Sequence, residues 1–426
     1  MEKVRIGIDE RVPPVRAFAL GFQHVLAMFG ATITVPLVVG NAIGLERHQI
    51  ALLIQVVLLA MGIATLLQTT VGSRYPIVQG SSFAFIPGLI SIGGSSGLAA
   101  VEGAMIAGGV VEALFGGLGI VGRLRKLFTP VVTGVTIMLI GFSLAHVAVK
   151  YALNFFSDPS AATAPKAFVI ALITFATTLV VALKSRGTLK AMPVIAGAVV
   201  GYVASVPLGM TDFALVSEFP VFNIPAPFPW GMPVFETSAI IILLFAYMVS
   251  IIESVGDYHA ISAISEAPIT RKHINRGIMS EGIACTIAGM LGANGTTSYS
   301  ENIGLVALTK VASRQVVQVG AFILIVMSLF PKFSAILASI PQPVLGGLTV
   351  ALYGMISVTG LRLIKDNVEL NDRNMLVIAS SLIIGLGAPQ LPSEFLQNFP
   401  KIVSGILESG MAAGAITAII LDQILR

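Results

Sequence analysis

Long apolar runs recur along the whole chain and restrict it to one class of fold. Fourteen such runs follow one another, most of about 17 to 25 residues, the length of a helix that crosses about 30 Å of hydrocarbon. With 55% apolar and 11% charged residues, the chain has far more apolar surface than a soluble core needs. The sequence therefore predicts an all-α polytopic membrane protein. The predicted segments are 16–40, 48–71, 77–95, 100–121, 129–149, 167–183, 188–209, 237–259, 276–292, 296–309, 315–331, 341–361, 374–388 and 406–424.

Lysine and arginine are distributed unevenly over the predicted loops. With the N-terminus inside, 20 of the 25 basic residues fall on the cytoplasmic side, as expected for inserted helices. We therefore expect a multi-pass protein of the cytoplasmic membrane with both termini in the cytoplasm. The formal charge of +4 then reflects this topology and gives no reason to expect a nucleic-acid partner.

The chain contains an internal repeat. The sequences PVVTGVTIMLIG at 130–141 and PVLGGLTVALYG at 343–354 share six residues in register, 213 positions apart. Seven predicted segments separate them, and an odd number places the second copy upside down, as in many secondary transporters. A second match joins GSSFAF at 80–85 to GTTSYS at 295–300. Interrupted segments in matching positions of two halves predict a binding site, because broken backbone survives at membrane depth only where it lines a cavity.

Acidic residues occur inside predicted membrane segments. Glu253 and Asp257 lie four residues apart on one face of the eighth segment, with Ser250 on the same stripe. Glu301 lies in the interrupted tenth segment. A carboxylate at membrane depth costs at least about 2.5 kcal/mol, which favours a binding or proton-carrying role over a structural hydrogen bond between helices. Three acids without a basic partner cannot all ionise comfortably, so at least one is expected to carry a proton.

Other polar residues at membrane depth have less certain roles. Gln23 and His24 lie midway along the first segment. The imidazole is either a satisfied core group or a partner that holds one of the two acids of the eighth segment. For Glu112 and Glu281 we expect a packing or gating role. The Pro-rich stretch 219–235, which contains the single tryptophan, is expected to be an external interfacial loop.

Four motifs resemble those of the nucleobase–cation symporter family, which includes uracil and xanthine permeases and ascorbate transporters. ENIGLVALTK at 301–310 fits the family signature of its tenth segment throughout. The pair QH at 23–24, SSFAF at 81–85 and ESVGDY at 253–258 also resemble family landmarks. The resemblance covers the chain from Ile6 to about residue 360.

The resemblance implies a specific architecture. It implies fourteen segments in two inverted repeats of seven, with short antiparallel strands in segments three and ten. Residues 1–122 and 237–335 would form a core module that holds substrate. Residues 123–236 and 336–426 would form a gate module that also carries a homodimer interface.

The resemblance also implies the site. Glu253 would accept hydrogen bonds from ring N–H groups and Glu301 would bind the opposite edge, while Phe83 would offer its ring face and backbone N–H. It assigns substrate binding to Glu253, Glu301, Phe83, Tyr299, Ser300 and Ala31, and cation coupling to His24, Gln23, Asp257, Asn302 and Ser250. It implies no resident cofactor and no metal site.

Two positions give conflicting indications of the substrate. Asp257 resembles the purine and ascorbate branches, whereas Glu301 resembles the uracil branch. Weighting Glu301, we predict a uracil importer, with xanthine, hypoxanthine or ascorbate as alternatives. The predicted mechanism is proton-coupled symport with alternating access. Sodium is the rival coupling ion, since Asp257, Ser250 and backbone carbonyls could ligate a hard cation.

Two other classes of function were weighed. GGSSG at 93–97 matches serine nucleophile patterns, with His146 as a conceivable base of an intramembrane protease. This leaves fourteen segments and an inverted repeat unexplained. A channel or anion exchanger of similar architecture should have basic residues along its pathway, and acids occupy the predicted site instead.

Overall fold

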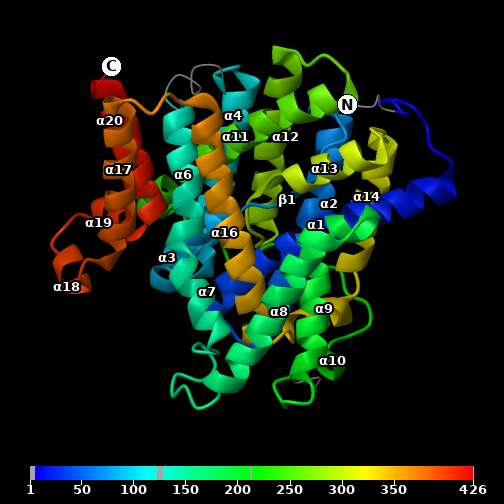
Figure 1. Ribbon diagram of the computed structural model, residues 1–426, viewed down its shortest axis with the longest axis horizontal. Coiled ribbons are helices and arrows are strands. Elements are labelled where there is room, and N and C mark those ends of the chain that lie inside the picture. Colours follow the sequence, from blue (N-terminus) through cyan, green and yellow to red (C-terminus); the bar gives the residue numbers. More distant parts are fainter. Residues whose placement is uncertain (1–4, 122–126, 128, 212–213, 426) are drawn as a thin grey trace.

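The computed structural model describes residues 5–121, 127, 129–211 and 214–425, and these form the predicted helical bundle (Figure 1). The first half contains α1 (Pro14–Ala42), α2 (Arg47–Thr70), β1 (Gln79–Ser81), the 3-10 turn η1 (Phe83–Phe85), α3 (Ile86–Ser95), α4 (Leu98–Gly117), α6 (Pro130–Ser143), α7 (Ala145–Ala152), α8 (Ala164–Lys184), η2 (Gly187–Ala191), α9 (Pro193–Ser205) and α10 (Ala214–Glu218). The second half contains α11 (Thr237–Ser265), α12 (Arg271–Met290), β2 (Thr296–Ser298), α13 (Ser300–Thr309), α14 (Arg314–Ser328), α15 (Pro331–Ala338), α16 (Gln342–Asn367), α17 (Asp372–Gly387), η3 (Ala388–Gln390), α18 (Ser393–Leu396), α19 (Lys401–Glu408) and α20 (Gly410–Ile424).

Each of the fourteen predicted segments overlaps a helix or a strand followed by a helix, but not all are long apolar helices. Within the described residues, seven helices are long and apolar enough to cross a membrane, and up to nine if each of two bent pairs counts as one span. The segments of β1 and β2 are broken, α12 is polar, and α9 and α17 are short. The count of fourteen crossings therefore stays a prediction.

The two short strands lie where segments three and ten were expected to break. β1 and β2 pair in antiparallel register, with Gln79 opposite Ser298 and Ser81 opposite Thr296. Gly80 is required here, because a Cβ at this position would lie 2.5 Å from the ring of Tyr299. The predicted antiparallel strands are thus confirmed.

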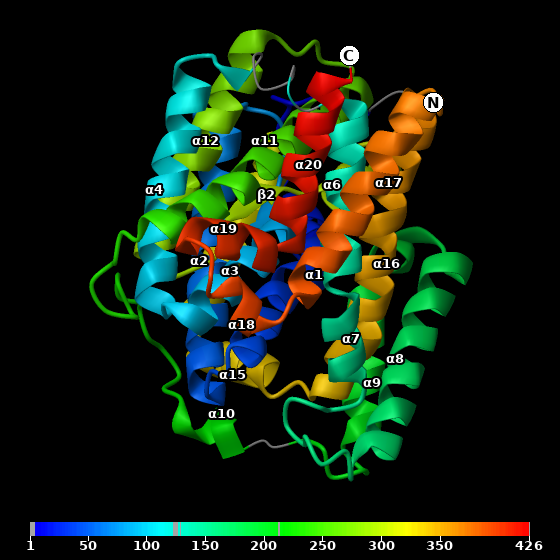
Figure 2. The same ribbon diagram turned by 90° about the vertical axis from the view of Figure 1, so that its left-hand side faces the viewer.

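The helices pack into two groups, which we name by their contents. The strand-bearing bundle comprises α1–α4, α11–α14 and both strands, and the outer bundle comprises α6–α9, α16, α17 and α20. In Figure 2, α2, α4 and α12 lie on one side of the molecule, and α7, α8, α9, α16 and α17 lie on the other. Within the strand-bearing bundle, α4 and α12 approach through glycine. A Cβ on Gly282 would lie 2.2 Å from the backbone nitrogen of Ala113.

The two copies of the sequence repeat pack against each other in opposite directions. Gly134 of α6 lies against Gly360 of α16, and Gly141 lies against Ser357. Further along, Ala152 of α7 meets Gly346. Residue numbers rise on one helix as they fall on the other, so the helices that carry the repeat are antiparallel, as an inverted repeat requires.

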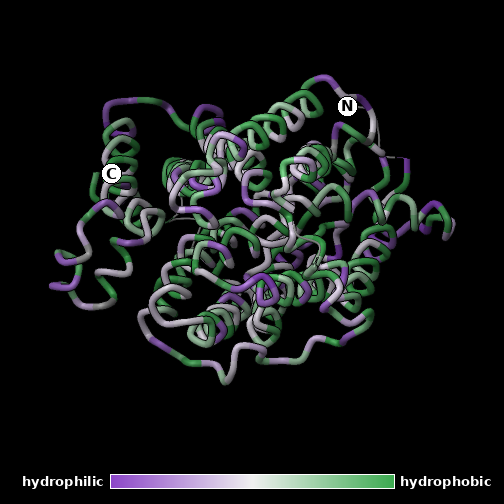
Figure 3. The backbone as a smooth tube through the Cα atoms, turned by 90° about the horizontal axis from the view of Figure 1, so that it is seen from below, coloured by the Kyte–Doolittle hydropathy of each residue, from purple (hydrophilic) through white to green (hydrophobic). Residues whose placement is uncertain are grey.

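Apolar surface covers the sides of the bundle. Figure 3 shows apolar residues along the helices and hydrophilic residues concentrated in the connections. Helix α8, for example, leaves Phe168, Leu172 and Leu183 exposed. Such a band suits contact with lipid, since large exposed apolar patches are rare on soluble monomers.

The Pro-rich stretch 219–235 lies across the ends of α4 and α12. The indole Nε1 of Trp230 donates to the carbonyl of Gly292 at 3.0 Å, and Phe228 N donates to the carbonyl of Met290 at 2.8 Å. Val234 N donates to the carbonyl of Ala99 at 2.9 Å. These contacts tie the connection to the strand-bearing bundle.

Both ends of the described chain lie at the same end of the bundle (Figures 1 and 2). The N-terminal segment is held there by a parallel bridge between Ile6 and Val311, directly after α13. An ion pair of 2.5 Å between Asp9 and Arg314 adds to this contact. A common side for both termini is what the charge pattern predicts, and the cytoplasmic assignment stays a prediction.

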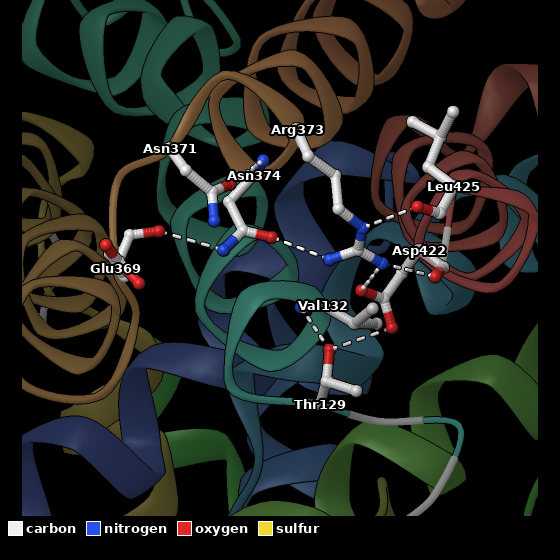
Figure 4. Close-up of polar contacts among 8 residues, drawn as sticks. All are labelled: Thr129, Val132, Glu369, Asn371, Arg373, Asn374, Asp422 and Leu425. Carbon is white, nitrogen blue, oxygen red and sulfur yellow. Dashed lines mark hydrogen bonds and ion pairs between the residues drawn. The ribbon is translucent and has the colours of Figure 1, made fainter.

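A polar latch joins the same ends of α6, α17 and α20 (Figure 4). Arg373 donates to the Asp422 carboxylate at 2.9 Å and to the Leu425 carbonyl at 3.0 Å, and Thr129 donates to Asp422 at 3.2 Å. The Asp422 side chain is only 3% exposed. Loss of its charge therefore removes charge-assisted bonds from a partly buried arginine.

We expect Asp422→Asn to lower the free energy of unfolding by about 2 kcal/mol. The matched control is Asp366→Asn, which breaks the Arg362–Asp366 pair, whose side chains are 81% and 55% exposed. That change should cost less than about 0.5 kcal/mol. Thermal unfolding of the detergent-solubilised protein measures both, and equal shifts for the two variants would contradict the assigned role of the latch.

Candidate functional site

Two short helices start from the paired strands in the middle of the strand-bearing bundle. β1 leads through η1 into α3, and β2 leads directly into α13. The free backbone N–H groups at the start of each helix therefore lie beside the strand pair. Glu301 occupies the first turn of α13, where a carboxylate is favoured by the helix dipole.

Glu253 and Glu301 approach each other at this point. Their carboxyl groups interact electrostatically. Glu253 on α11 is half-buried and Glu301 is exposed. Within the described residues no hydrogen bond engages the Glu253 carboxylate. Both acids can therefore accept hydrogen bonds from a bound molecule.

Open space lies beside these acids. Cβ atoms added at Gly256 of α11 or Gly304 of α13, one turn along from Glu253 and Glu301, would meet no other atom within 4 Å. Gly256 shares a face of α11 with Glu253 and with Ala260, and both Gly256 and Ala260 are exposed. The site is therefore open along α11, toward the end of the bundle where both chain termini lie.

Asp257 holds the backbone of the site in place. Its carboxylate accepts hydrogen bonds from Ser298 Oγ at 2.8 Å and from Ser300 Oγ at 2.7 Å. The side chain is 6% exposed. Asp257 thus joins α11 to the end of β2 and the start of α13.

His24 has its hydrogen-bond partner on α13. Asn302 Nδ2 donates to His24 Nδ1 at 3.0 Å and to the His24 carbonyl at 2.9 Å. Nδ1 then acts as an acceptor, which places the imidazole proton on Nε2. Neither acid of the eighth segment is bonded to His24 in the described residues, and the two bonds from Asn302 favour the alternative that His24 is a satisfied core group. Its role in cation coupling stays a prediction. His24 thus joins α1 to α13 beside Glu301.

The remaining predicted substrate residues lie around the same strands. Phe83 is half-buried, and its ring packs edge-on against the ring of Tyr353 in the outer bundle, with 6.1 Å between the two ring centroids. Tyr299 is 4% exposed, and its hydroxyl donates to the Ser81 carbonyl at 2.7 Å, so it supports the strand pair. Ala31 is 5% exposed, and Ser300 is exposed beside Asp257.

Behind the strands lies a polar network that the sequence did not indicate. Ser250 donates to Glu281 at 3.1 Å and Ser254 donates at 2.8 Å. Ser254 also contacts Ser298 at 3.1 Å. The spacing of Ser250 and Ser254 by one helical turn was the available signal. Gln23 Oε1 is buried without a partner in the described residues and takes no part in this network.

The site contains no evident transition-metal centre. Among the residues that the structure describes, no group of three or more His, Cys, Asp or Glu side chains is placed to hold a metal ion. Carboxylates, hydroxyls and an aromatic ring gather here instead, and their assignment to substrate binding stays a prediction.

Comparison with known proteins places the chain among permeases. The sequence profile of a family described as the permease family matches residues 16–394. The chain is 35% identical to the uric acid permease PucJ of Bacillus subtilis over 96% of this chain and 92% of that protein. It is 32% identical to the xanthine permease of B. subtilis over 96% of this chain and 93% of that protein.

A solved structure shows the same fold. The transmembrane domain of the cyanobacterial bicarbonate transporter BicA superposes with a TM-score of 0.65, covering 97% of this chain and all of that chain. At 15% identity this likeness concerns the fold alone.

The serine protease alternative is wrong, because the family consists of transporters. Ser95 ends α3 and bonds the carbonyl of Ser91 within its own helix. The extent of the match identifies the chain: it belongs to this permease family, the nucleobase–ascorbate transporters.

Proposed function

We propose that this protein imports an oxidised purine base, xanthine or uric acid, by proton-coupled symport. The observation that carries the proposal is the approach of Glu253 and Glu301 beside open space in the middle of the bundle. Two carboxylates accept hydrogen bonds and donate none when ionised. A planar base with N–H groups on opposite edges suits such a pair, and in this proposal the half-buried ring of Phe83 covers its face.

Purine is favoured over uracil by the relatives. Two relatives of 35% identity bear the name uric acid permease, and one of 32% identity bears the name xanthine permease. The geometry does not choose between the two, because Asp257, the residue that resembles the purine branch, is occupied by Ser298 and Ser300. The purine assignment therefore rests on the relatives. Uracil and ascorbate stay as alternatives that competition experiments decide.

Alternating access would come from movement between the two bundles. In this proposal the strand-bearing bundle is the core and the outer bundle is the gate. Given the predicted orientation, the open face of α11 corresponds to an inward-facing state. Association of two copies through the outer bundle is part of the same proposal and is tested by mass measurement in lipid discs.

Proton coupling follows from the charges at the site. Glu253, Asp257 and Glu301 lie together, and no ion pair joins them to a basic residue in the described part of the chain. Protonation of one acid lowers the cost of moving the loaded site past apolar side chains. Sodium is the competing choice and is tested in the same assay.

The testing experiment is uptake of radiolabelled xanthine into proteoliposomes that contain the purified protein. An inward proton gradient should drive accumulation, and unlabelled uric acid should compete more strongly than uracil. Uptake driven by a sodium gradient alone would identify sodium, and not the proton, as the coupling ion. Stronger competition by uracil or ascorbate would overturn the purine assignment.

Glu301→Gln should change specificity more than transport capacity. An amide can donate as well as accept, so a base that presents an acceptor to this edge gains relative to one that presents N–H. We expect the ratio of inhibition constants for two such bases to shift by about tenfold. A matched control is Glu10→Gln, an exposed acid of the N-terminal segment outside α11 and α13. Unchanged ratios would place Glu301 outside the substrate contact.

A further inference from the structure

A second pair of acids lies behind the strands, away from the open space. Glu112 of α4 and Glu281 of α12 are each 1% exposed, and their carboxyl groups interact electrostatically. They flank the closest approach of the two helices, where Gly282 meets Ala113. No ion pair joins either acid to a basic residue within the described part of the chain. Two ionised carboxylates at this position would leave uncompensated charge in a buried, low-dielectric region.

The two acids have very different surroundings. Glu281 accepts hydrogen bonds from Ser250 at 3.1 Å, Ser254 at 2.8 Å, and Tyr258 and Gln79 at 3.3 Å each. Both carboxyl oxygens of Glu112 lack a partner at hydrogen-bond distance among the described residues, and its one neighbouring donor is the weakly donating thiol of Cys285. Hydrogen bonds from several donors stabilise a carboxylate. These donors therefore favour the ionised form of Glu281, and the lack of donors at Glu112 favours its protonated form.

Two serine hydroxyls connect Glu281 to the substrate site. Ser298 Oγ lies 2.8 Å from Asp257 Oδ2 and 3.1 Å from Ser254 Oγ, and Ser254 Oγ lies 2.8 Å from Glu281. A hydroxyl has one proton, so Ser298 can donate to Asp257 or to Ser254 but not to both. When Asp257 is protonated, it can donate to Ser298, which then donates to Ser254, which donates to Glu281.

We propose that Glu112 and Glu281 form a second proton-holding site, joined to the substrate site by Ser298 and Ser254. This inference rests on the proposed proton symport and identifies where the proton is held. The proton of Asp257 passes to Ser298, the hydroxyl proton of Ser298 passes to Ser254, and that of Ser254 passes to Glu281. Each serine ends as a neutral hydroxyl, and one proton has moved from the substrate site to Glu281.

Other titratable groups surround the pair. Tyr258 donates to Glu281 from α11, and Cys285 lies beside both acids on α12. Glu253 of α11 interacts with Glu281, and Tyr247 of the same helix interacts with Glu112. None of these groups becomes a cation when it is protonated, so none of them can balance the charge of the two acids. One proton on Glu112 leaves Glu281 as the single charged member of the pair. The pair therefore carries one negative charge before it receives the transported proton.

The test separates substrate exchange from proton coupling in proteoliposomes with radiolabelled xanthine. Ser254→Ala breaks the hydroxyl chain, and Glu281→Gln removes the acceptor. We expect both variants to keep xanthine counterflow with a KM within about threefold of the wild type. Proton uptake per xanthine, followed with an internal pH dye, should fall by at least about fivefold. The matched control is Ser265→Ala, because Ser265 lies on the same helix as Ser254 and, among the residues that the structure describes, its hydroxyl bonds only the backbone of its own helix.

The outcomes distinguish this inference from the function on which it rests. Unchanged proton uptake in Ser254→Ala and Glu281→Gln, with counterflow intact, would overturn the second site. Absence of xanthine counterflow in the wild type would instead refute the proposed substrate. If Ser254→Ala does not fold, infrared spectroscopy of the wild type and of Glu112→Gln tests the inference by detecting the proton held on Glu112. The wild type should show a protonated carboxyl band at alkaline pH that the variant lacks, and its absence from the wild type would contradict the resident proton.

Discussion

Glu253→Gln is expected to abolish transport while leaving the protein folded. The carboxylate is half-buried, has no hydrogen-bond partner in the described residues and borders the open space. Its replacement by an amide removes a charged acceptor for ring N–H groups and presents an unfavourable donor instead. A charge-assisted hydrogen bond is worth about 1.5 to 3 kcal/mol, so binding should weaken by about 10- to 100-fold. Loss of the charge needed for coupling reduces accumulation further.

Equilibrium binding of radiolabelled xanthine to purified protein measures the first effect, and uptake into proteoliposomes measures both. Glu266→Gln is the matched control, since Glu266 is exposed just beyond the end of the same helix. It should bind and transport like the wild type. Binding by Glu253→Gln within about twofold of the wild type would remove Glu253 from the substrate contact.

Gly282→Val is expected to prevent stable folding. A Cβ at this position would lie 2.2 Å from Ala113 N and 2.6 Å from the Gly109 carbonyl. Both are backbone atoms of α4, so relief requires the two helices to separate. The separation would open the contact that also carries Glu112 and Glu281. Overpacking of this kind costs about 3 kcal/mol or more, because the neighbours cannot change rotamer to make room.

Fluorescence-detected size-exclusion chromatography should show the folded yield of Gly282→Val reduced at least about fivefold. Gly387→Ala serves as the control, because a Cβ at the end of α17 meets no atom within 4 Å. That variant should keep the wild-type yield and unfolding midpoint. A normal yield for Gly282→Val would mean that α4 and α12 are less closely packed than described.

Much of the architecture could be predicted because the membrane constrains the backbone strongly. Apolar length predicts the helices, since unpaired peptide groups are not tolerated in lipid. The matched repeats predicted that α6 and α16 would be antiparallel, and the interrupted segments predicted the strands. The hydrogen-bond partners of individual side chains were harder to predict from the sequence. The sequence left open whether His24 is a satisfied core group or the partner of an acid of α11, and the structure gives it Asn302 as a partner. The crossing of α1 and α13 that brings these two residues together depends on packing that periodicity does not encode.

The sequence by itself determined the fold class, the broken segments and the acids that lie at membrane depth. Only the tertiary structure decided which acid faces open space and which is enclosed. Asp257 and Glu253 share one helical face, yet two serines from β2 and α13 bond Asp257 and leave Glu253 free. Likewise Glu281 gained its donors from α11 and β1, far away in the chain. Residue type and spacing fix where a carboxylate points along its own helix, whereas its partners come from other elements and depend on how those elements pack.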